Sequence, residues 1–367
     1  MRQLLSGTVA ALAIIALAAT LATTFAESGT SPASPETTPS GALRDRPLEG
    51  FGATTPGGSG GTVYEISSLA DSGPGTLRDA VSSPNRMVTF AVGGTIDLAS
   101  SLRVSTHHIT IDGSTAPSPG ITITASSPGV MGALLDLKAC HDVIVRHLRI
   151  RDAPDVDAGD NVRIWDGAYN IVVDHCSMRR AGDGNLDISD NAHDVTVQWC
   201  LIAETVKNSL VRTGLSNLSF HHNLYASGDE RNPQLDDALV VDMVNNVIFD
   251  WASNYGTRVR NGSTANIVKN YYIPSERSDE SDALVIESST VYMNGNIMPP
   301  ACSAYGTIGS RLPAPAITEM SPDDALNAVL AEAGALPRDA EDTAYVAAVV
   351  ASPVERVYWG AIKAMFR

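Results

Sequence analysis

The sequence is poor in several residue types, and each shortage excludes a class of protein. Four cysteines in 367 residues are too few for a scaffold held together by disulfides. Lys and Arg number 25 against 41 Asp and Glu, which gives a net charge of -16. Nucleic-acid binding needs a basic surface, so we expect no nucleic-acid partner. An acidic polysaccharide partner would need local help from a bound cation or from a cluster of Lys and Arg.

Long apolar runs are also scarce and are confined to the N-terminus. Residues 1–26 contain Arg2, an apolar run over 9–21 and Ala26 before Glu27, a pattern typical of a secretory signal peptide. An uncleaved membrane anchor is the alternative. We therefore predict a secreted, extracellular protein without stable membrane insertion after signal cleavage. Residues 27–47 are rich in Ser, Thr and Pro, which predicts a flexible leader.

A short phrase repeats about every 24 residues through the middle of the chain. Each copy has a turn residue, an alternating apolar run and a final Cys or Asn. The steps between successive copies are 24, 23, 23, 24 and 26 residues, and the copies end at Cys176, Cys200, Asn223, Asn246, Asn270 and Asn296. This period without helical patterning predicts an all-β fold, a right-handed parallel β-helix over 48–300. Residues one coil apart then stack about 4.8 Å from each other.

Two interpretations depend on this stacking. The four asparagines that end the last copies should form a ladder of side-chain hydrogen bonds, unless they are ordinary turn residues. Cys176 and Cys200 fall in one column on adjacent coils, close enough for a disulfide. The alternative is a pair of small apolar side chains stacked inside the solenoid.

The two ends of the solenoid carry helical patterns. Residues 71–81 read DSGPGTLRDAV, which predicts an N-terminal capping helix. Residues 301–367 predict a helical capping segment, with helices over 322–334 and 340–351. The final stretch, 356–367, is amphipathic and could pack on the solenoid or touch a membrane or a partner.

Candidate site residues follow from the alternation in the segment DGNLDIS. Alternation sends Leu186 and Ile188 to one face and Asp183, Asn185 and Asp187 to the other. Adding one and two periods to Asp183 gives Lys207 and Arg231, and the coil before supplies Asp160 and Asn161; in sequence order these are Asp160, Asn161, Asp183, Asp187, Lys207 and Arg231. Grouped oxygen ligands suit Ca²⁺, and no His or Cys cluster has zinc-like spacing. Taken singly, each residue could instead be an ordinary surface charge.

From residue 50 to 274 the chain resembles bacterial secreted pectate lyases of polysaccharide lyase family 1. The matching pieces are GFGA, DSGPGTLRDAV, VVDH at 172–175 and RNP at 231–233. Two departures stand out in the motifs. Val172 occupies a position where many members have Trp, and Asp236 replaces the second arginine of the Arg-x-Pro-x-x-Arg signature.

The resemblance implies a calcium site at named positions. Asp183 and Asp187 correspond to acidic calcium ligands of the family. A further acidic ligand position falls on Asn161, with Asp160 beside it. An Asn carbonyl remains a permissible ligand for Ca²⁺.

The resemblance also implies the catalytic residues. Lys207 corresponds to the lysine that neutralises a substrate carboxylate, and Arg231 to the catalytic arginine. Arg258 and Arg260, one coil later, are candidates to replace the missing substrate-binding arginine, and Arg212 is a third.

These roles imply a calcium-dependent lyase that cleaves de-esterified polygalacturonate (pectate) by β-elimination to unsaturated oligogalacturonides. Removal of the C5 proton beside a carboxylate builds up negative charge, which a cation and Lys207 would stabilise. Two alternatives stay open, a lyase acting on methylated pectin and a non-catalytic cell-surface protein that binds carbohydrate or acts as an adhesin. We expect a monomer.

Overall fold

The computed structural model describes residues 46–126, 132–154, 159–252 and 254–352. The predicted signal peptide, nearly all of the leader and the amphipathic stretch 356–367 lie outside these residues. Within the described residues, no helix is both long enough and apolar enough to cross a membrane.

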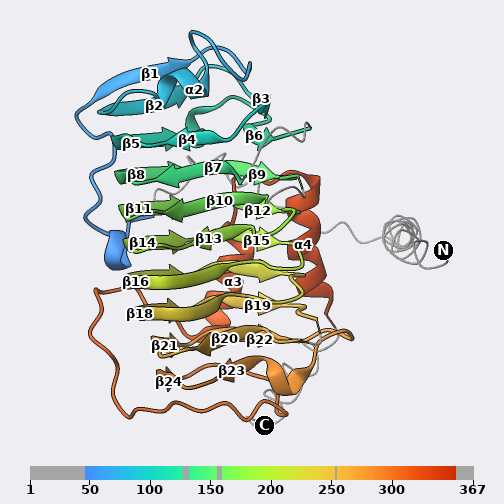
Figure 1. Ribbon diagram of the computed structural model, residues 1–367. Coiled ribbons are helices and arrows are strands. Elements are labelled where there is room, and N and C mark those ends of the chain that lie inside the picture. The colour runs from blue at the N-terminus through green and yellow to red at the C-terminus, as the bar shows by residue number, and fades with distance from the viewer. Residues whose placement is uncertain (1–45, 127–131, 155–158, 253, 353–367) are drawn as a thin grey trace, which may run out of the picture. The chain divides into compact units, whose positions relative to one another are not determined.

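The strands stack into the coils of a parallel β-helix, as the repeat predicts (Figure 1). A regular coil contributes three strands, for example β10 (Asp160–Trp165), β11 (Tyr169–Asp174) and β12 (Ser177–Arg179). Each strand pairs in parallel with its counterparts in the coils before and after. Three faces therefore run along the solenoid, and we call them faces A, B and C.

Faces A and B belong to one sixteen-stranded sheet, because two long strands continue through the bend between them. The long strands are β16 (Leu210–His221) and β18 (Gln234–Val244). Face A also contains β1 (Thr62–Ile66), β2 (Arg86–Phe90), β5 (His107–Asp112), β8 (His141–Arg146), β11, β14 (His193–Gln198), β21 (Thr264–Val268) and β24 (Thr290–Asn294). Face B also contains β4 (Leu102–Val104), β7 (Ala133–Lys138), β10, β13 (Leu186–Ile188), β20 (Thr257–Arg260) and β23 (Leu284–Ile286).

Face C is a separate eight-stranded sheet. Its strands are β3 (Gly94–Asp97), β6 (Ile121–Thr124), β9 (Leu148–Arg151), β12, β15 (Leu201–Ala203), β17 (Leu224–Ala226), β19 (Val247–Phe249) and β22 (Tyr271–Ile273). Short 3-10 turns lie at Gly50–Gly52, Gly113–Thr115 and Glu280–Asp282.

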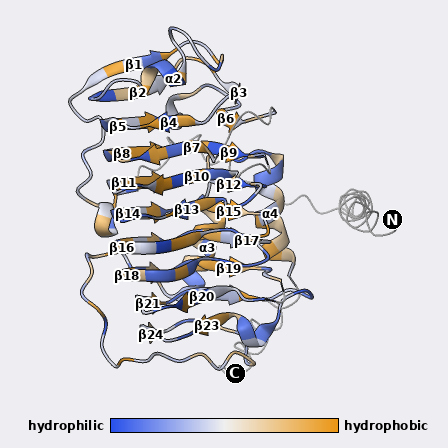
Figure 2. Cartoon of the chain, in the orientation of Figure 1, coloured by the Kyte–Doolittle hydropathy of each residue, from blue (hydrophilic) through white to orange (hydrophobic). Residues whose placement is uncertain are grey.

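The register on face A reproduces the repeat of the sequence. One inward column runs through Ile171, Val195, Leu218, Val241, Ala265 and Val291, so its steps are 24, 23, 23, 24 and 26 residues. All six side chains are buried. Figure 2 shows hydrophobic residues recurring on the strands of successive coils. Each coil buries its apolar side chains inside the solenoid on those of its neighbours, which explains why the period appears in the sequence.

Asparagines satisfy polar groups at a bend of the solenoid, as predicted. The Nδ2 atoms of Asn223, Asn246 and Asn270 donate to the Oδ1 atom of the next asparagine in the column, the last being Asn296, at 2.9, 2.9 and 3.1 Å. Cys176 and Cys200 stand earlier in this column, and both are buried free thiols. The stacked interpretation of the two cysteines is therefore confirmed, and the disulfide is not formed.

The helices lie at the expected positions. α2 (Leu77–Ala80) lies beside β1 at the N-terminal end, where Thr76 caps it by accepting from Asp79 N. α3 (Pro322–Glu332) and α4 (Ala340–Ala351) begin after the capping residues Ser321 and Asp339. They cover face C (Figure 1), where Leu326, Val329 and Val349 pack with apolar residues of β15, β17, β19 and β22.

Candidate functional site

A polar hollow opens on the outside of face B, around β10, β13 and the start of β16. We call it the acidic hollow. It contains six of the candidate residues, and its lining is Asp160, Arg163, Trp165, Asp183, Asp187, Ser189, Asp190, Lys207, Leu210, Arg212 and Arg231. The spacing of about one coil thus brings together residues up to 71 positions apart, from Asp160 to Arg231.

Strand alternation explains how β13 presents its acid. Leu186 and Ile188 are fully buried, so Asp187 between them points outward. On the preceding coil Arg163 lies opposite Asp187, between the buried Val162 and Ile164 of β10. The two strands therefore place an arginine and an aspartate side by side on the floor of the hollow.

The carboxylates of Asp160 and Asp187 meet above Gly184. A Cβ atom added to Gly184 would lie 2.5 Å from Asp187 Oδ1 and 3.0 Å from Asp160 Oδ1. Asp160 Oδ1 accepts a hydrogen bond from Gly184 N at 2.9 Å, and Asp187 Oδ1 accepts one from Leu210 N at 3.0 Å. Only glycine leaves room for both carboxylates at this point.

Crowding of these acids shifts their protonation. Burial raises the pKa of Asp160, and the negative charges of Asp187 and Asp183 raise it further. Burial also raises the pKa of Asp187, a rise that the hydrogen bond from Leu210 and the charge of Arg231 partly offset. The hollow thus holds negative charges at a cost that a bound cation would relieve.

The donor set fits a hard divalent cation. Asp160, Asp183 and Asp187 offer carboxylate oxygens, which are ligands that Ca²⁺ prefers, and the flexible coordination of Ca²⁺ tolerates the remaining positions being filled by water or by a ligand. Asp183 Oδ1 is engaged with Lys207 Nζ at 2.6 Å. A cation held by all three acids would therefore compete with Lys207 for Asp183.

Lys207 and Arg231 reach the hollow from the two following coils. Lys207 pairs with Gly184 on one side and with Glu230 on the other. The side chain of Asn208 bonds to that of Asn232, so Arg231 is an extra residue between two matched positions, with φ of 63°. Its Nε lies 3.6 Å from Glu230 Oε1 and has no hydrogen-bond partner among the described residues. This local bulge turns the guanidinium outward into the hollow.

Asn161 and Asn185 correct the expectation that they face outward. Both side chains are fully buried at a bend, where alternation no longer holds. They begin a second asparagine ladder, in which each Nδ2 donates to the next Oδ1 at 2.6 to 2.7 Å, through Asn161, Asn185, Asn208 and Asn232. Asn161 Oδ1 also accepts from Ala153 N. Asn161 is therefore not placed to bind a metal in the hollow, whereas its neighbour Asp160 is.

The structure does not place Arg258 and Arg260 in the acidic hollow. They lie on β20, where Arg258 donates two hydrogen bonds of 2.9 Å to Glu287 and Arg260 Nε lies 3.5 Å from Asp236. Asp236 is in register with Arg212 on one side and with Arg260 on the other. An acid thus separates two arginines at the position where the family motif has an arginine.

Arg163 and Trp165 also line the hollow; the sequence suggests Trp165 as a residue that could line a sugar groove but assigns Arg163 no role. The Trp165 ring lies under two cations, with Lys138 Nζ and the Arg163 guanidinium carbon each 4.2 Å from its centroid. Its Nε1 donates to Asp136 Oδ1 at 2.6 Å. The sequence contains the pattern that could have identified them. Alternation about Val162 and Ile164 sends Arg163 and Trp165 outward, and one period added to Arg163 gives Asp187.

No protein-family model matches the sequence, but several known proteins are similar to it. The chain is 34% identical over 328 residues to "Probable pectate lyase C" of Aspergillus terreus, covering 82% of this chain and 75% of that protein. The protein of the same name from Emericella nidulans is 34% identical, covering 80% and 73%. These relatives are fungal rather than bacterial.

Solved structures share the fold. The cedar pollen allergen jun a 1 superposes with a TM-score of 0.63 at 19% identity, covering 78% of this chain and 92% of the allergen. A pectate lyase from Bacillus sp. N165, solved in complex with trigalacturonate, has a TM-score of 0.60 at 18% identity, covering 78% and 98%.

Proposed function

Because this chain belongs to the pectate lyase family of polysaccharide lyases, we propose that it is an exported calcium-dependent enzyme that cleaves de-esterified polygalacturonate by β-elimination. The products would be unsaturated oligogalacturonides. The observation that carries the proposal is the grouping of Asp160, Asp183, Asp187, Lys207 and Arg231 around one hollow. Three carboxylates that could bind a cation then lie beside Lys207 and Arg231, whose positive charges would attract a polyanion.

Different residues of the hollow would bind the cation and the substrate carboxylate. Asp160, Asp183 and Asp187 would hold Ca²⁺, which when bound supplies positive charge next to a substrate carboxylate. Lys207 would exchange its 2.6 Å contact with Asp183 for a contact with that carboxylate. Neutralising the carboxylate lowers the cost of forming a carbanion at the adjacent C5 atom.

Arg231 would act on the C5 proton. In the elimination the proton leaves C5, a double bond forms between C4 and C5, and the C4–O bond breaks with its electrons going to the leaving oxygen. A guanidinium is normally fully protonated, so its use as the base requires alkaline conditions and cationic neighbours such as Arg212. As an electrostatic clamp, Arg231 would instead stabilise the developing charge while hydroxide takes the proton.

Asp236 weakens one end of the proposed substrate contact. Its carboxylate accepts a 2.6 Å hydrogen bond from Asn261 and lies 3.5 Å from Arg260 Nε. Arg212 lines the hollow and is the residue best placed to replace the missing arginine. The outward-facing Arg258 and Arg260 would meet a substrate only one coil further along face B.

The proposal is tested by the ultraviolet absorbance of the unsaturated product. We expect absorbance to rise on polygalacturonate with Ca²⁺, and excess EDTA should abolish the rise. Arg231→Lys keeps the charge but loses the forked guanidinium, so activity should fall by about 100-fold or more. Arg311→Lys is the control, because Arg311 pairs with Asp242 and Glu319 away from the hollow.

Other results would favour the alternatives. Activity on methylated pectin but not on polygalacturonate would indicate a pectin lyase. Binding of polygalacturonate without any absorbance rise from neutral to alkaline pH would indicate a carbohydrate-binding protein. Full activity of Arg231→Lys would remove Arg231 from the proposed role of base but leave the clamp.

A further inference from the structure

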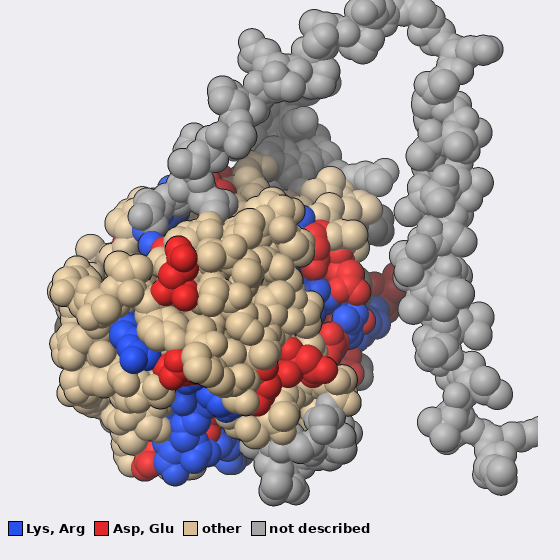
Figure 3. Space-filling view, turned by 90° about the horizontal axis from the view of Figure 1, so that it is seen from above, with Lys and Arg blue, Asp and Glu red and all other residues tan. Residues whose placement is uncertain are grey.

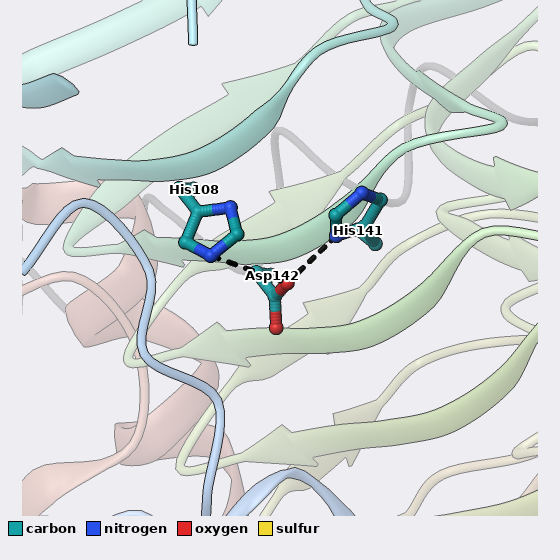
Figure 4. Close-up of side chains that lie close together, drawn as sticks. All are labelled: His108, His141 and Asp142. Atoms are coloured by element: carbon teal, nitrogen blue, oxygen red, sulfur yellow. Dashed lines mark hydrogen bonds and ion pairs between the residues drawn. The ribbon is translucent and has the colours of Figure 1, made fainter. Parts of the chain in front are cut away.

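A second group of possible metal ligands lies on face A, apart from the acidic hollow. It comprises His108 of β5 with His141 and Asp142 of β8, and Figure 4 shows both rings directed at the Asp142 carboxylate. One ligand atom from each residue lies within 4.8 Å of the other two. We propose that these residues form a binding site for a divalent transition-metal ion, with Zn²⁺ as the best-fitting ion.

The distances suit an ion shared between the three side chains. His108 Nε2 lies 3.7 Å from Asp142 Oδ2, which is too long for a hydrogen bond. Two ligand atoms of a tetrahedral Zn²⁺ are about 3.4 Å apart, because each is about 2.0 to 2.1 Å from the ion. His141 Nδ1 lies 2.6 Å from Asp142 Oδ2, so this pair would open by roughly 0.8 Å to admit the ion.

Neighbouring side chains already hold the three ligands in orientation. His107 Nδ1 lies 2.9 Å from His108 Nδ1, and when His108 Nδ1 is the donor in this contact, His108 Nε2 presents a lone pair. Asn170 Nδ2 donates to Asp142 Oδ1 at 3.0 Å, which leaves Oδ2 for a metal. The His141 ring is stacked between His107 and Tyr169, with centroids 4.9 and 4.8 Å away. Such supporting contacts to ligands are typical of metal sites.

The donor set separates this site from the acidic hollow. Two imidazole nitrogens and one carboxylate oxygen suit Zn²⁺, Cu²⁺ or Ni²⁺, whereas Ca²⁺ prefers oxygen alone. The side chains of His108 and His141 are 39% and 30% exposed, so an ion can enter from solvent and a fourth position stays open. The metal would connect two adjacent coils, and the proposal does not depend on lyase activity.

A later coil provides a matched comparison within the chain. His193 and Asp194 repeat the His-Asp pair two coils on, with Nδ1 and Oδ2 2.7 Å apart. The neighbours of His193 in its column are Tyr169 and Ser216 rather than a second histidine. Asp142 and Asp194 both have φ above 50°, as does Asn170 between them, so asparagine is tolerated in this column.

The test is Zn²⁺ binding by the untagged full chain, with millimolar Ca²⁺ present to fill the acidic hollow. A chelating dye measures affinity, and Co²⁺ absorption reports the ligands. We expect one bound ion per chain and a Zn²⁺-dependent rise of the melting temperature. Asp142→Asn and His108→Asn should each weaken Zn²⁺ binding by about 10-fold to 100-fold, while Asp194→Asn should not change it.

Three outcomes would overturn the proposal. The first is no stoichiometric Zn²⁺ binding by the wild-type chain. The second is wild-type affinity in both Asp142→Asn and His108→Asn. The third is an equal loss in Asp194→Asn, which would indicate non-specific binding by His-Asp pairs. Circular dichroism of each variant separates loss of the site from loss of the fold.

Discussion

Asp160 and Asp187 hold protons more tightly than ordinary carboxyl groups, and this has a consequence for metal binding. Their pKa values are raised mainly by burial and, for Asp160, next by the charge of Asp187. In the metal-free protein the folded state therefore binds more protons than the unfolded state. The stability that follows is present at low pH and is lost as pH rises through the raised pKa values.

Calcium bound at the proposed site would displace these protons, so its affinity should increase with pH. Below the raised pKa values, each displaced proton should weaken Ca²⁺ binding about tenfold per pH unit. Isothermal titration at weakly acidic, neutral and alkaline pH checks this. Asp187→Asn removes one titrating group and should flatten the dependence. An affinity that does not change with pH in the wild-type chain would contradict the assignment of Asp160 and Asp187 as ligands.

The sequence predicts the hollow better than it predicts each individual ligand. Adding the coil period to Asp183 finds Lys207 and Arg231, because stacking converts a sequence offset into a contact. Alternation failed at Asn161 and Asn185, because a bend turns their side chains inward. The sequence repeat of about 24 residues does not reveal the site of His108, His141 and Asp142. The residues in register on its two coils are 34 positions apart, as His107 and His141 are.

At the scale of elements, the buried asparagine ladder beneath the hollow positions the surrounding backbone. Asn208 sits in its middle, accepting from Asn185 Nδ2 and donating to Asn232 Oδ1. Asn208 itself is fully buried. The ladder joins the coils that carry Asp183, Lys207 and Arg231, so its order should be required for the geometry of the hollow.

Removing one rung should therefore destabilise the protein. Asn208→Ala leaves one of the two N–H groups of Asn185 Nδ2, and Asn232 Oδ1, without their partners in the ladder, each worth about 1 to 3 kcal/mol. We expect the free energy of unfolding to fall by about 2 to 4 kcal/mol in denaturant titrations followed by circular dichroism. Asn327→Ala on the exposed side of α3 is the control and should change it by no more than about 0.5 kcal/mol. Equal effects of the two substitutions would show that the ladder contributes little.

The sequence predicts where the strands lie but not which of them continue from one face into the next. The repeated phrase locates the strands of face A and the steps between them. It gives no sign that β16 and β18 run without interruption from face B to face A. Left-handed residues allow these bends, Gly214 with φ of 66° in β16 and Asp237 with φ of 56° in β18, while the pairing resumes after a register shift.

On the face seen in Figure 3, charged residues gather in local groups of both signs. The net charge is -16, yet acidic and basic side chains lie close together in the view of Figure 3, with broad uncharged areas between them. The hollow follows the same pattern, with four aspartates beside Lys207 and three arginines. This arrangement allows an acidic protein to approach an acidic polymer at one place.

The C-terminal helices complete the surface of face C, and adjacent residues of α4 test this. Val349 is fully buried against face C, whereas Val350 is 56% exposed. Val349→Ala should lower the free energy of unfolding by about 2 kcal/mol, because it removes two buried methyl groups and leaves a small cavity. Val350→Ala should change it by less than about 0.5 kcal/mol. Thermal unfolding measures both, and equal values would mean that α4 does not pack on the solenoid in solution.

The same helices connect several successive coils. Asp339 pairs with Arg151 of β9, Glu341 with Arg179 of β12, and Tyr345 with Glu204 after β15, while α3 contacts β19 and β22. They therefore brace the middle coils of the β-helix. If the two ends of the β-helix are pulled apart, the outer coils should unfold one at a time, and the braced coils around the acidic hollow should unfold last.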